Sequence, residues 1–393
     1  MIPLQEMKMS RAWAEVNLDA IAHNVQEIKK ILKPETKLLG VVKADAYGHG
    51  FREVAKTLLQ NGADTLGVAT IDEAMQLRAR EIKAPILILG HTPDSRAQDL
   101  VEYDITPTVF SYSLAKAVSD VAVRMGKQAK IHISLDTGMS RIGFNTEDED
   151  VETILSIHRL PNVEIEGMFT HFAKADEKDH AYTEMQFERF MDMARRLEAR
   201  GLFIPVKHVC NSAGVMEYPQ YQLDMVRPGI ILYGQYPSDD VDKSKLDLIP
   251  AMELKAVITH INTKEKGVRV SYGGTYKTYK DFTKIATIPI GYADGYLRNL
   301  SNNADMIAGG QRVPVIGRIC MDQCMIDVTA VNNISVGDEV IIFGKRGDEV
   351  ITVTELATLM GTINYEILCV IGKRIPRVYL KDGKIVNVLS YLK

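Results

Sequence analysis

Residues 37–70 have the sequence KLLGVVKADAYGHGFREVAKTLLQNGADTLGVAT and contain one complete strand–helix–strand unit. The apolar runs KLLGVVKA (37–44) and TLGVAT (65–70) predict two buried strands. Between them, FREVAKTLLQNG predicts an amphipathic helix that ends near Gly62, since glycine takes a positive φ at little cost. Strands that are apolar along their whole length are typical of a parallel sheet with both faces covered.

The same unit recurs along residues 15–235. Eight apolar or β-branched runs predict strands, at residues 37–44, 65–70, 85–90, 105–110, 130–136, 163–171, 206–212 and 224–230. Most segments between them have helical spacing, and the first helix shows it in its apolar residues: Leu18, Ile21, Val25, Ile28 and Leu32. Gly126 and Gly201 follow two further helical runs. Eight such units in roughly 215 residues favour a (β/α)8 TIM barrel over an open doubly wound sheet.

The pattern changes after about residue 240. Runs such as KSKLDLIPAMELKAVITHI (243–261) alternate polar with apolar or β-branched residues, which is typical of a mostly antiparallel β domain. ITVTELATLMG (351–361) is the one clear helix expected there, and the polar stretch at 237–245 marks the boundary. We therefore predict a cofactor-binding barrel at 12–240 and a C-terminal β domain at 241–393, with residues 1–11 packing against the second domain.

Composition excludes several classes of protein. Of the 393 residues 46% are apolar and 25% charged, as in ordinary globular proteins, which excludes disordered and fibrous chains. The net charge of −4 argues against a nucleic-acid partner. Four cysteines are too few for a disulfide scaffold, and Cys320 and Cys324 lack the spacing of a zinc knuckle, so no metal is expected. Without a signal peptide or membrane span, we expect a cytoplasmic protein.

Polar residues gather where the predicted strands end. Four lie at or just after strand ends: Lys43, which closes the first strand, Arg141, His171 and Ser212; a fifth, Arg227, lies within the eighth strand. Each alone is more often structural: a solvated lysine, a hydrogen-bonded histidine or a helix-capping serine. A barrel, however, brings its strand ends together on its functional face, and the loops after strands seven and eight commonly bind phosphate. A half-buried amine, a phosphate site and an arginine on one rim suit pyridoxal phosphate.

Ten motifs resemble one family. VVKADAYGHG (41–50) resembles the cofactor-attachment signature of alanine racemases, which are two-domain pyridoxal-phosphate enzymes with a barrel followed by a β domain. Nine further motifs occur in order: RAWAEVNLDAIAHN, DTGMSRIGF, GMFTHFAKAD, HVCNSAG, DMVRPGI, VSYGGTY, IPIGYADGY, GRICMDQCMIDVT and INYEILC. The resemblance implies an enzyme that interconverts L-alanine and D-alanine and supplies D-alanine for peptidoglycan.

The resemblance also implies roles for particular residues. Lys43 resembles the Schiff-base lysine that moves the proton on one face of the substrate. Tyr272 resembles the base of the opposite face, which the partner subunit supplies in a head-to-tail homodimer with shared sites. Arg141 and the main chain of Met321 match a clamp for the substrate carboxylate, and Tyr292 resembles a residue at the entry to the site.

The remaining implied roles concern pyridoxal 5'-phosphate itself. His171 is similar to a histidine that stacks on the ring and supports the tyrosine base, and Arg227 to the partner of the ring nitrogen. The phosphate contacts are matched by five residues: Tyr47, Ser212, Gly229, Ile230 and Tyr365. Racemisation needs two bases on opposite faces, and lysine and tyrosine have reference pKa values of about 10.4 and about 10, so both need tuning. His171 and Arg141 are the expected tuning groups for Tyr272.

One position departs from the family pattern. The family often has a lysine, modified to a carbamate, seven residues before the arginine of DTGMSR, and here that position is Ser134. We expect a bound anion such as chloride near Ser134 and Arg141. A bromide soak checks this, because a map without an anomalous peak beside these residues contradicts it.

Three alternatives stay open at this point. A pyridoxal-phosphate amino-acid decarboxylase of the same fold usually pairs the ring nitrogen with a carboxylate, and Arg227 argues against it. A non-catalytic pyridoxal-phosphate carrier resembles the barrel alone, so the β domain with Tyr272 discriminates against it. A racemase of broader range, active on serine, is the third.

Overall fold

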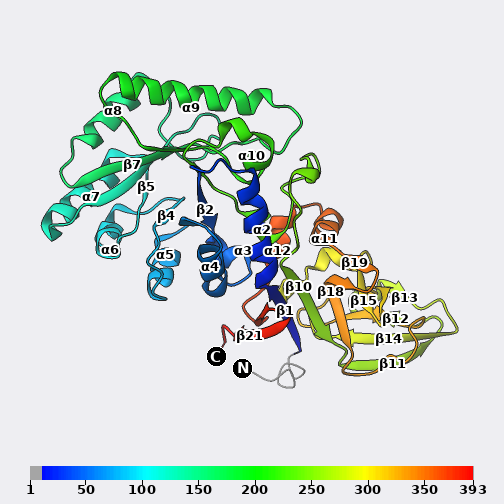
Figure 1. Ribbon diagram of the computed structural model, residues 1–393. Coiled ribbons are helices and arrows are strands. Elements are labelled where there is room, and N and C mark those ends of the chain that lie inside the picture. Colours follow the sequence, from blue (N-terminus) through cyan, green and yellow to red (C-terminus); the bar gives the residue numbers. More distant parts are fainter. Residues whose placement is uncertain (1–10, 393) are drawn as a thin grey trace. The chain divides into compact units, whose positions relative to one another are not determined.

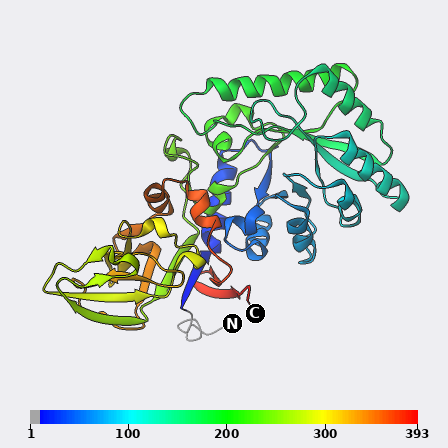
Figure 2. The same cartoon turned by 180° about the vertical axis from the view of Figure 1, so that it is seen from behind.

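The computed structural model describes residues 11–392, which form two compact units (Figures 1 and 2). The first unit comprises Ala20–Ala46 and Phe51–Ile249. The described part of the second comprises 11–19, Tyr47–Gly50 and 250–392. Residues 1–10, whose packing the sequence analysis predicts, lie outside the described residues, and the boundary after residue 240 stays a prediction.

The first unit contains eight short parallel strands in the predicted places. Their bounds are β2 (Lys37–Val41), β3 (Thr65–Val68), β4 (Ile86–Ile88), β5 (Thr108–Val109), β6 (Ala129–Ser134), β7 (Val163–Phe169), β8 (Val206–His208) and β9 (Met225–Val226). Hydrogen bonding gives two groups, in the orders β4-β3-β2-β9 and β5-β6-β7-β8. All of these pairs are parallel.

Main-chain contacts join the two groups into a ring. A parallel bridge pairs Leu87 of β4 with Thr106, and the N–H of Ile88 donates to the carbonyl of Thr106 at 2.9 Å. On the other side, the N–H of Arg227 donates to the carbonyl of Cys210, also at 2.9 Å. The strands therefore close into a barrel, and the predicted fold class is confirmed.

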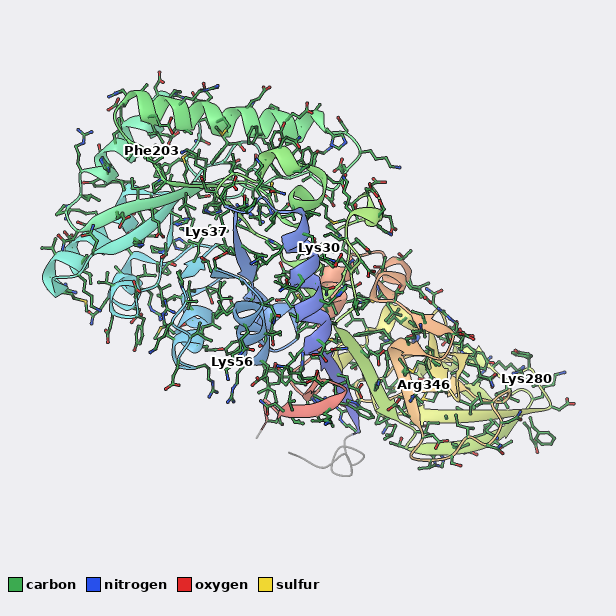
Figure 3. The ribbon with its side chains drawn as sticks, in the orientation of Figure 1. Lys30, Lys37, Lys56, Phe203, Lys280 and Arg346 are labelled. Atoms are coloured by element: carbon green, nitrogen blue, oxygen red, sulfur yellow. The ribbon has the colours of Figure 1, made fainter. Side chains whose placement is uncertain are left out.

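Helices connect the strands. They are α2 (Leu18–Ile31), α3 (Lys43–Tyr47), α4 (Phe51–Gln60), α5 (Ile71–Arg78), α6 (Ala97–Glu102), α7 (Tyr112–Met125), α8 (Asp148–His158), α9 (Ala181–Ala199) and α10 (Ser212–Glu217). Ile21, Val25 and Ile28 of α2 are fully buried, as the predicted apolar face requires. Gly126 ends α7 in the left-handed conformation. Lys30 and Phe203 of this unit, labelled in Figure 3, are both exposed.

The second unit is mostly antiparallel. Its strands are β1 (Ala12–Asn17), β10 (Met252–Val257), β11 (His260–Glu265), β12 (Arg269–Val270), β13 (Tyr276–Lys277), β14 (Phe282–Ile288), β15 (Asp305–Ala308), β16 (Gln311–Pro314), β17 (Cys324–Asp327), β18 (Glu339–Arg346), β19 (Glu349–Ile351), β20 (Arg377–Lys381) and β21 (Lys384–Leu389). An eight-stranded sheet follows the order β16-β15-β18-β10-β1-β20-β21, with β19 beside β18. Its one parallel pair joins β1 to β20.

Two α-helices, rather than one, lie within residues 250–392 of the second unit. The predicted helix is α11 (Val353–Met360), which starts at the N-cap Thr352 and ends at Gly361 in the left-handed conformation. The second is α12 (Asn364–Cys369), so the expectation of a single clear helix is wrong. Six residues are too few for a helical period to stand out in the sequence.

No helix formed by residues 11–392 has both the length and the apolar character that a membrane crossing requires.

Candidate active site

The segment that carries Lys43 leaves the barrel as a left-handed turn. Strand β2 ends at Val41, so the expectation that Lys43 closes the strand is wrong. Lys43 instead opens α3, in which Ala44, Asp45 and Ala46 have φ of 51°, 55° and 55°. Each such residue costs about 1–2 kcal/mol relative to the right-handed form. The turn therefore needs specific contacts to hold it.

Two side chains supply those contacts within the first unit. Glu73 of α5 accepts hydrogen bonds from the N–H of Ala44 and of Ala69, both at 2.7 Å. The buried Tyr233 donates its hydroxyl to the carbonyl of Val41 at 2.8 Å. Glu73 thus ties the loop after β3 to the turn after β2. Sequence reasoning missed this role, because Glu73 has the ordinary position of a capping-box residue.

Arg227 follows β9 and is 4% exposed. Its Nη1 donates to Nδ1 and to the carbonyl of His208, at 2.9 and 2.8 Å. Its Nη2 donates to the carbonyls of Thr170 and Val209 at 2.7 and 3.1 Å, and lies 3.4 Å from Nδ1 of His171. None of these partners is a carboxylate. Burial lowers the pKa of Arg227 to about 10, so the guanidinium stays charged at neutral pH.

The charges of three basic side chains act on the imidazole of His171. Burial lowers the pKa of His171 well below its usual range, and the charges of Arg227, Arg141 and Lys43 lower it further. His171 is therefore neutral at physiological pH. All four residues belong to the first unit and follow different strands, so this end of the barrel gathers an amine, two guanidinium groups and an uncharged imidazole.

A buried glutamine connects the loops of His171 and Arg141. Gln186 of α9 accepts from the N–H of Ala173 at 2.8 Å and donates to the carbonyl of His171 at 3.0 Å. Its amide also lies 3.4 Å from the hydroxyl of Thr137, four residues before Arg141. Sequence reasoning missed Gln186, since nothing in a helical run marks a glutamine that points inward.

The residues after β8 and β9 meet through main-chain and hydroxyl groups. The N–H of Gly229 donates to Oγ of Ser212 at 2.8 Å. Ser212 is the first residue of α10, whose N-cap is Asn211, so the N-cap interpretation of Ser212 is wrong. Ile230 begins a 3-10 turn directly after Gly229. Three predicted phosphate contacts therefore adjoin one another within the first unit.

The two predicted tyrosine contacts to phosphate belong to the second unit. The rings of Tyr47 and Tyr365 have centroids 6.1 Å apart. Burial raises the pKa of Tyr47, so its hydroxyl stays protonated. Gly48 has a φ of 79°, and a Cβ there would lie 2.2 Å from the carbonyl of Leu368, so only glycine fits this approach to α12.

Tyr272, Met321 and Tyr292 also belong to the second unit. Tyr272 begins a 3-10 turn and is 68% exposed, while Met321 is 52% exposed. Oγ of Ser271 donates to the carbonyl of Arg318 at 2.5 Å, which joins the Tyr272 turn to the Met321 loop. The N–H of Tyr292 donates to the carbonyl just before Met321 at 3.1 Å. The three residues thus lie on connected loops.

Family comparisons match most of the chain. The model "Alanine racemase, N-terminal domain" matches residues 16–237, and "Alanine racemase, C-terminal domain" matches residues 251–379. The alanine racemase of Clostridium tetani is 50% identical over 381 residues, which cover 97% of this chain and 98% of that protein. The alanine racemase of Methanococcus maripaludis is 50% identical over 368 residues, with 94% and 98% covered.

Solved structures agree with these matches. The alanine racemase of Clostridium difficile 630 has a TM-score of 0.95 at 46% identity, with 98% of this chain and 100% of that chain covered. The Bacillus anthracis alanine racemase with bound L-Ala-P has a TM-score of 0.92 at 38% identity, with 97% and 98% covered. Because the β domain matches as well as the barrel, a carrier that resembles the barrel alone is excluded. The matches also favour a racemase over the same-fold decarboxylase.

Proposed function

Because the chain belongs to the alanine racemase family, we propose that Lys43 and Tyr272 are the two groups that move the α-proton of alanine, one on each face. The enzyme is a pyridoxal 5'-phosphate-dependent isomerase that interconverts L-alanine and D-alanine. The observation that supports the assignment of Lys43 is that its charge, together with those of Arg141 and Arg227, acts on the buried His171 and lowers its pKa.

The described residues fit the cofactor. Pyridoxal phosphate needs an amine for its aldehyde, donors for its phosphate and a partner for its ring nitrogen. Lys43 offers the amine, Ser212 and Gly229 adjoin one another where barrels commonly bind phosphate, and Arg227 offers a buried donor. When bound, the cofactor withdraws electrons from the α-carbon of the amino acid and so acidifies its hydrogen.

As the family membership implies, we assign the phosphate contacts to five residues: Tyr47, Ser212, Gly229, Ile230 and Tyr365. Tyr47 suits this role because burial raises its pKa and keeps its hydroxyl a hydrogen-bond donor. The Gly229 segment adds main-chain groups, and these can approach a phosphate closely because glycine has no side chain.

Racemisation requires a proton to leave one face of the α-carbon and another to arrive on the opposite face. In our assignment Nζ of Lys43 holds and moves the proton on one face, and Oη of Tyr272 does so on the other. Tyr272 takes the proton from L-alanine. Arg141 and the main chain of Met321 bind the substrate carboxylate and so fix which face each group meets.

Arg227 has a different task, which is to pair with the ring nitrogen. A guanidinium donates hydrogen bonds without giving up a proton readily, so it would leave the ring nitrogen of the bound cofactor unprotonated. A carboxylate at this position would favour the protonated nitrogen and stronger electron withdrawal. Arg227 therefore suits proton exchange at the α-carbon and limits transamination as a side reaction.

We further propose that the enzyme is a homodimer in which Tyr272 of the partner subunit completes each site. Tyr272 and Met321 are 68% and 52% exposed in the single chain. A base that removes a carbon-bound proton works best where water is excluded, so a second chain has to cover it. We place this dimer in the cytoplasm, where it supplies D-alanine for peptidoglycan.

The substitution Lys43→Ala tests the assignment of the amine. We expect it to abolish the absorbance band of the bound cofactor near the visible edge and to lower racemisation by at least about a thousandfold. Lys56→Ala, on α4, is the matched control and should leave both unchanged; Figure 3 labels this lysine. A Lys43→Ala protein that keeps the band would place the attachment at another residue.

The range of substrates is a separate question. Racemisation of serine, assayed beside both alanine enantiomers, measures it.

A further inference from the structure

Arg227 is one end of a run of side-chain hydrogen bonds inside the barrel, and the proposed mechanism uses only that end. Nδ1 of His208 accepts from Nη1 of Arg227 at 2.9 Å, and Nε2 of His208 lies 2.9 Å from Nδ1 of His132. Nε2 of His132 lies 3.4 Å from Oε2 of Glu166. The other oxygen of Glu166 accepts from Nζ of Lys130 at 2.6 Å.

The run passes from the barrel interior to solvent. Lys130 and His132 lie on β6, Glu166 on β7 and His208 on β8. His208 and His132 are 0% and 3% exposed, whereas the side chains of Glu166 and Lys130 are 27% and 48% exposed. A partly solvated carboxylate thus connects, through two buried imidazoles, to a buried guanidinium.

Only one arrangement of protons satisfies every member of the run. Arginine can only donate hydrogen bonds, and an ionised carboxylate can only accept them. His208 must therefore accept at Nδ1 and carry its proton on Nε2, and His132 must do the same. Burial lowers the pKa of both imidazoles, which keeps them neutral as this arrangement requires.

The acceptor end of the run is a charged carboxylate. The hydrogen bond from His132 lowers the pKa of Glu166 to about 2, and the ammonium of Lys130 contributes in the same direction against burial. Glu166 is therefore ionised throughout the physiological range. Every bond between Arg227 and Glu166 then points from the guanidinium towards the carboxylate, and Lys130 donates to Glu166 from the other side.

Two local features of β7 make room for this run. Ile131 pairs with Ile165 and His132 with Gly167, so Glu166 is the extra residue of a β-bulge. A bulge redirects the side chain it carries. A Cβ on Gly167 would lie 2.4 Å from Cε1 of His132, so only glycine leaves space for the ring. The backbone is thus shaped around His132 and Glu166.

We propose that Glu166 and His132 are positioning residues for the racemase reaction, and that with His208 they form a one-way relay which holds Arg227 as a charged, correctly oriented donor to the cofactor's ring nitrogen. This inference rests on the role proposed for Arg227 above. A buried guanidinium without an adjacent carboxylate needs compensation. Through the aligned dipoles of the two imidazoles, the negative charge of Glu166 stabilises the positive charge of the Arg227 guanidinium.

Paired substitutions of His132 separate the relay from simple packing. Asparagine keeps an acceptor close to the position of Nδ1, whereas leucine fills similar space without any acceptor. We expect His132→Leu to lower kcat about tenfold in both directions, because a buried donor of His208 loses its partner. The KM for alanine should stay within about twofold, since Arg141 and Met321 hold the substrate. His132→Asn should recover part of kcat, because it restores an acceptor for His208 but not the bond to Glu166.

If His132 only packs the core, the order of the two kcat values is reversed, because leucine is a better core residue than asparagine. A His132→Leu enzyme whose kcat equals or exceeds that of His132→Asn overturns the proposal. Cofactor absorbance recorded for each variant shows whether the lost rate comes from unloaded protein.

A second measurement needs no turnover. In the wild-type holoenzyme with 15N-labelled histidine, NMR should show His132 and His208 as neutral rings protonated on Nε2 at pH 7. Assignment uses His132→Asn and a second variant, His208→Asn. A charged ring, or a proton on Nδ1 of either residue, overturns the relay. If Lys43→Ala instead keeps the cofactor band, the proposed function fails while these spectra still decide the relay.

Discussion

At the scale of single residues, Arg227 and Glu166 differ in how the protein holds their charges. Arg227 is deeply buried, and its partners are carbonyls and the imidazoles of His208 and His171. Glu166 is partly solvated and is stabilised in its ionised form by His132 and Lys130. Burial lowers the pKa of Arg227 and so disfavours its charged form. At Glu166, hydrogen bonds lower the pKa by more than burial raises it, so the charged form is favoured. The ionisation of Glu166 should therefore contribute to stability.

We expect Glu166→Gln to destabilise the protein in a pH-dependent way. The pKa of Glu166 is lowered to about 2 in the folded state, below its unfolded value, so its ionisation stabilises the fold above about pH 4.5. The variant should lose on the order of 2 kcal/mol of unfolding free energy at pH 7. More than about half of that difference should disappear by pH 3, as the carboxylate of the unfolded chain becomes protonated.

Urea unfolding at pH 7 and pH 3 measures this difference. Glu164→Gln is the matched control, because Glu164 lies on the same strand and is exposed. A difference between wild type and Glu166→Gln that stays constant with pH would contradict the account of Glu166.

At the scale of elements, the left-handed turn after β2 is the feature that most affects Lys43. Ala44, Asp45 and Ala46 have a conformation that isolated chains avoid, so the turn depends on its neighbours. Glu73 supplies the acceptor for the N–H of Ala44. Removing that acceptor should release the turn without changing any residue that contacts the cofactor.

We expect Glu73→Ala to weaken cofactor binding by about tenfold or more, since two main-chain donors lose their acceptor. Glu73→Gln keeps one acceptor oxygen, so its cofactor affinity should lie between those of Glu73→Ala and wild type. Cofactor affinity is measured by titrating the cofactor-free protein and following the absorbance band. Equal cofactor affinity in wild type and Glu73→Ala would show that the turn keeps its conformation without Glu73.

The sequence predicts the regular elements because each has its own period. All eight barrel strands lie where apolar runs occur, and the buried face of α2 follows helical spacing. The sequence does not predict α12, the turn at Lys43 or the bulge at Glu166. Their conformations depend on contacts between residues far apart in the chain, such as the hydrogen bond from Ala44 to Glu73.

The residues of the candidate site likewise fall into those that the sequence could place and those that it could not. Arg141, His171 and Arg227 could be placed on one rim because a barrel collects its strand ends there. Glu73 and Gln186 could not, because each acts by bonding to a loop that the sequence does not place beside it. The relay residues are hidden for a further reason, since a histidine inside a strand is ordinarily a packed core residue.

At the scale of the whole molecule, each proposed active site needs residues from two chains. In the proposed dimer, each chain contributes the Lys43 of one site and the Tyr272 of the other. In a twofold dimer, a chain that lacks Lys43 and a chain that lacks Tyr272 then have their damage in the same site. The second site of that heterodimer keeps both groups.

A heterodimer of Lys43→Ala with Tyr272→Phe, purified through a different tag on each chain, therefore tests the central claim most directly. Each homodimer should be at least about a hundredfold less active than wild type, because each lacks one of the two bases. The heterodimer should recover about half of the wild-type rate per dimer, since one of its two sites is intact. If Lys43 and Tyr272 of the same chain act together, both sites are damaged, and a heterodimer as inactive as the two homodimers would contradict the account.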